Sequence, residues 1–346
     1  MKIRPASILF AVAAATTALS AGTAQAQTVI LKVHHFQPAT ANFPINFIEP
    51  WCAKIAKESA DRLKCQIYPS MQLGGTPAQL FGQAKDGVAD IVWTVGSYQA
   101  GRFTKTEAME LPFMTRTGKG SSQALWAYVH KDALDEYEGV KLIAVHFSDG
   151  VAFHFTEAQP KTMDDLKGLK VRASARTAAQ MLSSLGATPV SMPLPAVPEA
   201  MSKGVIDGAA VPWEGVPVVK LQEIAHYHLD TPPGSRQAAN SFLVFGMNQA
   251  KYDSLPTDLK KVIDDNSGPA VSARAGEVFD QAHDANRKMV IDSGGKVVYI
   301  SDSELQRWMK ATEPMTAAWL KEAAAKGLDG KKLLEDAHEL LSQYDK

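Results

Sequence analysis

Short β-branched runs alternate with amphipathic stretches along most of this 346-residue chain. The run at 29–33 ends before Pro38, and apolar residues then recur every fourth position at Phe47, Trp51 and Ile55, as on one face of a helix. Strands that alternate with helices predict a mostly parallel sheet, and the chain is long enough for two such α/β lobes. The predicted β-rich runs are 29–33, 63–68, 90–95, 141–147, 153–156, 169–172, 205–210, 241–247 and 296–300.

Charge and motif content exclude several classes of protein. The 36 Lys and Arg residues nearly balance the 37 Asp and Glu residues, so the charge gives no reason to expect a nucleic-acid partner. Two cysteines are too few for a four-Cys zinc or iron–sulfur site. The sequence also lacks the serine-nucleophile elbow, the phosphate-binding loops and the HExxH zinc motif. We therefore predict no catalytic residue and no cofactor.

The N-terminus has the pattern of a secretory signal. Lys2 and Arg4 form a short basic start, residues 8–19 are apolar, and small residues precede Gln27. This pattern predicts a Sec-type signal peptide over 1–26, with cleavage between Ala26 and Gln27. The apolar stretch is too short to span about 30 Å of hydrocarbon, which argues against a membrane anchor. The mature chain is therefore expected to be exported.

The two cysteines leave two alternatives open. Export into an oxidising compartment permits a disulfide between Cys52 and Cys65. A helix over 44–60 followed by a strand over 63–68 would bring the two residues to nearly the same level. Whether their Cα atoms approach within about 7 Å does not follow from the sequence. Two buried free thiols are the other alternative.

Two histidine pairs are candidate metal ligands. His34 and His35 are adjacent on a predicted strand and so point to opposite faces. His226 and His228 share a face, but the sequence places no third ligand beside them. We therefore predict no metal site.

Five segments in fixed order carry a family resemblance, and they span about 150 residues. Together they make the chain resemble the solute receptors of tripartite ATP-independent periplasmic (TRAP) transporters, the DctP family, from about residue 31 to 322. The segments are RLKCQIYPSMQLGG at 62–75, KDGVADIV at 85–92, ELPF at 110–113, DLKGLKVR at 165–172 and GVIDG at 204–208.

The resemblance implies a fold, a role and partners. The fold is a two-lobed periplasmic solute-binding fold (type II-like), with a long helix spanning both lobes. The ligand is an organic acid held in the cleft between the lobes, and the partners are a small and a large membrane subunit. The implied location is the periplasm. The predicted division is a signal peptide at 1–26, lobe I from 27–149 plus 239–278, and lobe II from 150–238 plus 279–346.

Arg172 is the residue that the resemblance singles out. It ends the Gly-Leu-Lys-Val-Arg segment, and in the family the arginine at this place grips the ligand's carboxylate. A guanidinium can hold a carboxylate through two parallel hydrogen bonds, which fixes direction as well as charge. A surface salt bridge is the alternative for Arg172, and Arg176 is expected to be the more solvated of the two arginines.

Departures from the sialic-acid-type receptors bear on the substrate. Those receptors have a second arginine about 20 residues before the clamp, where this chain has Phe153 and His154. Aromatic residues follow several predicted strands, and loops at the carboxyl ends of strands face the crevice in open α/β sheets. We therefore predict a monocarboxylate with an apolar or aromatic body, either plain or carrying a 2-oxo or 2-hydroxy group. Glu214 or His154 would bond that oxygen. The predicted ligand-binding residues are His35, Phe36, Gln37, Trp93, Thr94, Tyr98, Phe153, His154, Arg172, Trp213, Glu214 and Phe242.

Two other functions stay open at this point. A receptor for an ATP-driven importer would share the two-lobe closing mechanism. A periplasmic lyase would use His154 or His35 as a base, although no nucleophile–base spacing supports it.

Overall fold

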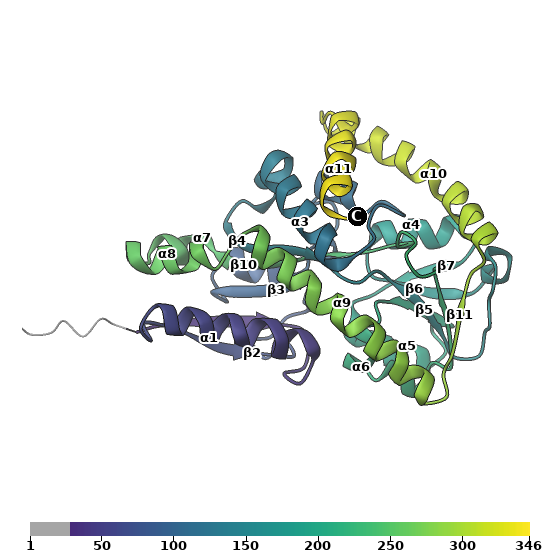
Figure 1. Cartoon of the computed structure of the whole chain (residues 1–346), viewed down its shortest axis with the longest axis horizontal. Coiled ribbons are helices and arrows are strands. Elements are labelled where there is room, and N and C mark those ends of the chain that lie inside the picture. Colours follow the sequence, from purple (N-terminus) through teal and green to yellow (C-terminus); the bar gives the residue numbers. More distant parts are fainter. Residues whose placement is uncertain (1–27) are drawn as a thin grey trace, which may run out of the picture.

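The computed structural model describes residues 28–346, so the predicted signal peptide lies outside the described residues. Two β-sheets lie side by side with helices on their faces (Figure 1). The first sheet has the strand order β2-β1-β3-β10-β4, and the second has the order β11-β9-β5-β8-β6-β7. The two-lobed α/β architecture predicted from the sequence is confirmed.

The strands of each sheet come from separate parts of the chain. The first sheet is made of β1 (Val29–His35), β2 (Leu63–Tyr68), β3 (Ile91–Val95), β4 (Val140–Phe147) and β10 (Phe242–Asn248). The second is made of β5 (Ala152–Phe155), β6 (Lys170–Ala173), β7 (Thr188–Ser191), β8 (Gly208–Val211), β9 (Tyr227–Asp230) and β11 (Lys296–Tyr299).

Both sheets are mixed, whereas the alternating pattern predicts mostly parallel pairing. β1 pairs parallel with β2 and β3, but β10 runs antiparallel to β3 and β4. In the second sheet β5 runs antiparallel to β8 and β9. β5 and β10 are the strands with which the chain enters one sheet directly from the other. Such a strand does not follow a βαβ crossover of its own sheet, so nothing makes it parallel to its neighbours.

One predicted strand begins later than expected. The pattern at 205–210 predicts a strand with a tight turn, but β8 starts only at Gly208. The backbone N–H groups of Val205 and Ile206 donate instead to the carbonyl of Ala200, at the end of the preceding helix. These residues therefore complete a helix end, and their N–H groups are not available to the sheet.

Helices cover the outer faces of both sheets. The α-helices are α1 (Glu49–Glu58), α2 (Leu80–Lys85), α3 (Gly118–Tyr128), α4 (Arg176–Ser184), α5 (Val197–Ser202), α6 (Gly215–Val218), α7 (Gln249–Asp253), α8 (Thr257–Asp265), α9 (Pro269–Asp292), α10 (Asp302–Ala325) and α11 (Gly330–Tyr344). Shorter 3-10 or π turns lie at Pro44–Ile48, Pro77–Gln79, Gly96–Tyr98, Thr106–Glu110, Val129–Ala133, Leu134–Tyr137, Met163–Leu166, Leu194–Ala196 and Leu221–Glu223. Within residues 28–346, no helix is both long enough and apolar enough to cross a membrane.

Helix α9 spans both lobes, as predicted from the resemblance. It packs on α3 and β4 of the first lobe and reaches β11 of the second, and it runs diagonally across the molecule in Figure 1. A close backbone approach fixes its position, because a Cβ on Gly276 would lie 2.1 Å from the carbonyl oxygen of Gly118 in α3. Only glycine permits this contact, so α9 is fixed against the first lobe at one point.

The last two helices form a second connection. α10 contacts α4 of the second lobe, and α11 packs against α3 of the first lobe. The division drawn from the sequence assigns all of 279–346 to lobe II, whereas α11 packs on the first sheet's side. The exact lobe boundaries stay a prediction.

A disulfide joins Cys52 of α1 to Cys65 of β2, with their Cα atoms 5.7 Å apart. Of the two alternatives left open by the sequence, the structure has the bridged one. It ties the first helix to the edge strand of the first sheet. The bridge closes a short loop, with a sequence separation of 13 residues.

Loss of this disulfide is expected to lower the free energy of unfolding by about 3 kcal/mol, because the crosslink restricts the unfolded chain. The test is urea unfolding of the Cys52→Ala/Cys65→Ala variant and of the wild type with and without reductant. Reductant should weaken the wild type and leave the variant unchanged. Equal stability of the oxidised wild type and the variant would contradict the prediction.

Candidate functional site

A cavity with about 480 Å³ of empty volume lies between the two sheets. Its lining comes from both lobes and from the spanning helix α9, so it exists only where the lobes meet. The lining residues are Phe36, Gln37, Trp93, Val95, Tyr98, Ser148, Val151, Arg172, Ser174, Leu194, Pro212, Glu214, Ser241, Leu243 and Phe279.

Arg172 is the cationic side chain of this cavity. It lies on β6 and is only 2% exposed. Its Nε donates to the carbonyl of Met192 at 2.9 Å, and its Nη1 donates to the carbonyl of Ala210 at 2.8 Å. Its Nη2 donates to the hydroxyl of Tyr98 at 3.5 Å. These partners hold the guanidinium in place, but all of them are neutral.

No carboxylate balances this charge in the part of the chain that the structure describes. Burial lowers the pKa of Arg172, and only Tyr98 opposes the shift. An arginine nevertheless stays protonated in a protein. A buried cation without a counter-charge is costly. The position therefore suits an anion.

Arg176, four residues further on, shows the contrast. It pairs with Glu107 from the first lobe and, at 2.7 Å, with Glu322 of α10. Arg176 is the more exposed of the two arginines, as expected, with 33% of its side chain exposed, but these two carboxylates also hold it in ion pairs. Arg176 therefore forms ion pairs with two carboxylates, whereas the charge of Arg172 remains available to an anion.

Tyr98 adds a donor beside Arg172. Its hydroxyl oxygen accepts hydrogen bonds from Arg172 and from the backbone N–H of Leu194, at 3.2 Å for the latter. Both lone pairs of that oxygen are then occupied, which leaves the hydroxyl hydrogen free to donate. A carboxylate bound at Arg172 would accept a hydrogen bond from this hydroxyl in addition to those from the guanidinium.

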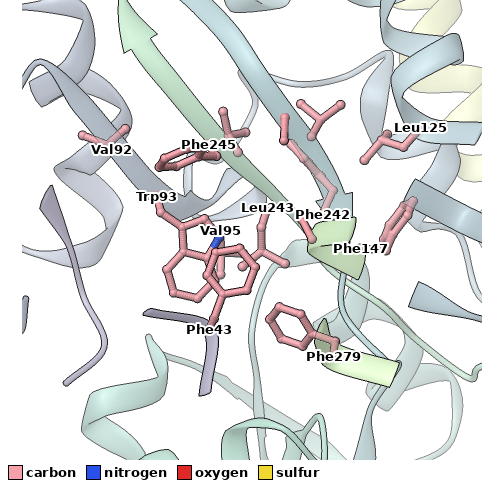
Figure 2. Packing of buried hydrophobic residues seen from close by; sticks show 14 of the residues in the cluster. Phe43, Val92, Trp93, Val95, Leu125, Phe147, Phe242, Leu243, Phe245 and Phe279 are labelled. Carbon is pink, nitrogen blue, oxygen red and sulfur yellow. The ribbon is translucent and has the colours of Figure 1, made fainter. Parts of the chain in front are cut away.

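An apolar aromatic wall lies beside this polar end of the cavity. The rings of Phe36 and Trp93 stack with centroids 5.1 Å apart, and Phe43 also stacks on Trp93, with centroids 4.1 Å apart. Figure 2 shows Phe43 lying against Trp93, with Phe279 nearby. Such a stack presents a flat apolar surface, the shape that an aromatic ring packs against well.

The buried imidazole of His146 fixes the indole of Trp93. The indole Nε1 of Trp93 donates a hydrogen bond to Nε2 of His146 at 2.9 Å. Desolvation lowers the pKa of His146 to about 3, so the imidazole is neutral and its Nε2 can accept. The other ring nitrogen then donates to the carbonyl of Phe147 at 3.1 Å. The wall is therefore rigid as well as apolar.

Glu214 and Gln37 form a second polar group of the cavity. Glu214 is 1% exposed, and its Oε2 accepts from Nε2 of Gln37 at 3.4 Å. Burial, and secondarily the charge of Asp149, raise the pKa of Glu214 to about 8. Glu214 is therefore protonated and neutral at pH 7.

Half of the residues predicted to bind ligand line this cavity, and half do not. Those that line it are Phe36, Gln37, Trp93, Tyr98, Arg172 and Glu214. Those that do not are His35, Thr94, Phe153, His154, Trp213 and Phe242.

Three of the six outside the cavity belong to strand faces that point elsewhere. Thr94 alternates with Trp93 along β3, and its hydroxyl donates to the carbonyl of Pro77. Phe153 packs edge-on against Trp308 of α10. Phe242 packs against Phe103 and over Gly96.

The other three are buried histidine or indole side chains, one in the first lobe and two in the second. His35 contacts the edge of Trp93, and neither of its ring nitrogens has a hydrogen-bond partner within residues 28–346. His154 shares a hydrogen bond with His228 at 2.7 Å. The indole of Trp213 donates to Asp230 at 2.7 Å. Burial lowers the pKa values of His35 and His154 to about 4 and 3, so both imidazoles are neutral.

Sequence reasoning missed several lining residues. Ser148, Ser174 and Ser241 lie just beyond strand ends, where the rule that loops at strand ends face the crevice would have found two of them. Phe279 lies in the middle of α9, and no local pattern indicates that it reaches the cavity. Val95 and Leu243 have the pattern of ordinary strand residues.

Two α/β lobes, a helix that spans them and a cavity lined by both define a solute-binding protein. The DctP family model, described as bacterial extracellular solute-binding protein, family 7, matches residues 33–322. The chain belongs to this family, and it is a solute receptor of the TRAP type and not an enzyme.

Solved structures of similar proteins agree with this assignment. A TRAP solute-binding protein from Rhodoferax ferrireducens T118, in complex with copurified benzoate, is 42% identical, with a TM-score of 0.90 over 92% of this chain and 98% of its own. A marine metagenome TRAP protein specific for aromatic acid ligands, in complex with 3-hydroxybenzoate, is 44% identical, with a TM-score of 0.90 over 92% and 100%. A Bordetella bronchiseptica TRAP protein with bound (R)- and (S)-mandelate is 28% identical, with a TM-score of 0.84 over 92% and 100%.

Proposed function

We propose that this receptor binds an aromatic monocarboxylate in the cavity between its lobes, with the carboxylate on Arg172 and the ring against Trp93 and Phe36. The proposal rests on the buried guanidinium of Arg172, whose hydrogen-bond partners are all neutral. A single cation suits a single carboxylate, and a dicarboxylate would leave its second charge in an apolar cavity.

The walls of the cavity support an aromatic body, because the stacked rings of Phe36 and Trp93 line it. The three similar proteins described above hold benzoate, 3-hydroxybenzoate and mandelate. Mandelate is a 2-hydroxy acid, so a 2-hydroxy or 2-oxo group remains part of the proposed ligand range.

The proposal includes delivery of the ligand to a small and a large TRAP membrane subunit, with the receptor in the periplasm. Family membership and the signal pattern of residues 1–26 support this part. The hinge-like crossings of the chain at β5 and β10 would let the lobes separate to release the ligand.

The test is thermal unfolding of the purified protein against a panel of acids. The panel holds benzoate, mandelate, phenylglyoxylate and cyclohexanecarboxylate, with acetate, succinate, glucuronate, amino acids and peptides as contrasts. A ligand at a hundredfold excess over its Kd should stabilise the protein by about 2.7 kcal/mol. We expect stabilisation by the aromatic monocarboxylates and none by succinate or glucuronate.

Two results would reject the proposal. Stabilisation confined to amino acids or peptides would indicate the ligand range of an ATP-driven importer. Stabilisation by succinate or glucuronate above that by benzoate would mean that the cavity accepts a different class of acid. Mass spectrometry of the denatured protein would reveal a ligand that copurified and so concealed a shift.

A further inference from the structure

Two side chains of the cavity have buried oxygen atoms that the protein leaves without a hydrogen bond. Among the lining residues, these atoms are Oε1 of Gln37 and Oε1 of Glu214. A buried polar atom without a partner costs free energy, and in native proteins it calls for an explanation. Both lie in one cavity with Arg172, and Gln37 and Glu214 are already bonded to each other.

The environment of Glu214 decides which form of the carboxyl is present. Among residues 28–346, no cation contributes to the pKa shift of Glu214. The charged group acting on it is Asp149 at the end of β4, whose own oxygen bonds to Nδ1 of His283 on α9 at 2.9 Å. Asp230, which faces both of these groups, bonds to the indole of Trp213. The backbone N–H of Phe43 acts in the opposite direction and lowers the pKa of Glu214, but this effect is smaller than that of burial.

The pair therefore offers one donor and one acceptor. Burial raises the pKa of Glu214 to about 8, so at pH 7 its carboxyl carries a hydrogen that it can donate. The free Oε1 of Gln37 can only accept. A hydroxyl group has the complementary set, since it donates one hydrogen and accepts at its oxygen.

We propose that Glu214 and Gln37 are specificity-determining residues that bind a hydroxyl group on the ligand while Arg172 holds its carboxylate. This inference rests on the proposed function and narrows it to hydroxylated aromatic monocarboxylates. A hydroxyl would satisfy both unpaired atoms, whereas an unsubstituted ring leaves them unsatisfied. A site built to hydrogen-bond a hydroxyl rejects the analogue that lacks it more strongly than an apolar pocket rejects an added hydroxyl.

The test compares benzoate with 2-, 3- and 4-hydroxybenzoate by calorimetry at pH 7. We expect the wild type to bind one hydroxy isomer about 10- to 100-fold more tightly than benzoate, the size of one or two buried hydrogen bonds. Glu214→Leu should reduce this ratio to within about threefold of unity. Glu214→Gln keeps a neutral donor of the same shape, so it should retain most of the ratio. Glu199→Leu on the exposed face of α5 is the matched control, and its ratio should equal that of the wild type.

A pH series gives a second readout that does not depend on the leucine variant folding. Benzoate stays ionised throughout, while Glu214 loses its proton as the pH rises through about 8. The new negative charge opposes an anionic ligand, so the Kd of the wild type for benzoate should rise above pH 8. Glu214→Gln should remove this part of the pH dependence. Asp149, His283 and Asp230 are present in both proteins, so the difference between the two isolates Glu214.

The failure of this inference is distinguishable from the failure of the proposed function. If benzoate binds but the hydroxybenzoate ratio is the same in the wild type and Glu214→Leu, the hydroxyl role is rejected and the receptor role stands. The hydroxyl role is rejected in the same way if the wild type and Glu214→Gln share one pH profile. If no benzoic acid binds the wild type at all, the proposed ligand class itself is rejected.

Discussion

Replacing Arg172 with alanine should weaken binding of an aromatic monocarboxylate by about 30-fold to several thousand-fold, which corresponds to about 2–5 kcal/mol. The guanidinium is 2% exposed, so the charge interaction with a bound carboxylate is little screened by water. Arg172→Lys should bind with intermediate affinity, because an ammonium keeps the charge but loses the planar two-point grip. Calorimetric titration of the two variants with benzoate measures both effects.

The stability of the ligand-free protein separates this role from a structural one. Removal of Arg172 relieves the burial of a charge without a carboxylate partner but also takes the donors from the carbonyls of Met192 and Ala210, so the two opposing effects should change the unfolding free energy by only about 1 kcal/mol or less. Arg274→Ala on the exposed face of α9, where the arginine pairs with Glu277, is the control and should leave binding intact. Unchanged affinity in Arg172→Ala would move the carboxylate site elsewhere. A large loss of unfolding free energy without ligand would instead make Arg172 a structural residue.

Local sequence pattern is sufficient for much of the fold. It predicts the strand over 63–68 with its observed bounds, because β-branched and aromatic residues stand between clear turn signals. It misses the strand β7 because Pro189 lies within it, and proline normally argues against a strand. β7 is an edge strand with one partner, β6, so a missing N–H is tolerated there.

The sequence predicts the direction of the strands less well than their positions. A pattern of alternating strands and helices says nothing about where the chain changes lobes. β5 and β10 enter their sheets from the other lobe, and only the tertiary arrangement makes them antiparallel. The same holds for α11, whose sequence does not indicate that it returns to the first lobe.

The site shows where local reasoning ends. Arg172 follows from a motif, and Phe36 follows from its place just after the end of β1, whereas Trp93 lies within β3. His154 and Trp213 are also near strand ends, but their side chains bond to His228 and Asp230 and do not line the cavity. Which of several aromatic residues faces a cavity depends on strand register and on the packing of distant segments. The sequence alone contains neither.

Trp93 links the stability of the first lobe to the recognition of an aromatic ring, so its replacement should affect both. The indole is fully buried, stacked against Phe36 and Phe43, and hydrogen-bonded to His146. Trp93→Ala should lower the free energy of unfolding by about 3–5 kcal/mol, the usual cost of removing a large aromatic side chain from a core. Chemical denaturation of the ligand-free variant measures this loss.

The milder Trp93→Phe variant separates recognition from stability. Phenylalanine keeps an aromatic ring but loses the hydrogen bond to His146 that orients the indole, so the preference for benzoate over cyclohexanecarboxylate should fall. Trp308→Phe is the matched control. That tryptophan is equally buried and donates to Glu304 at 3.0 Å, but it lies against Phe153 in the other lobe and away from the cavity. Both variants should lose similar stability, and only Trp93→Phe should change the ratio of the two Kd values. If both variants change that ratio equally, the effect comes from general loosening of the protein, and the stacked wall does not select aromatic ligands.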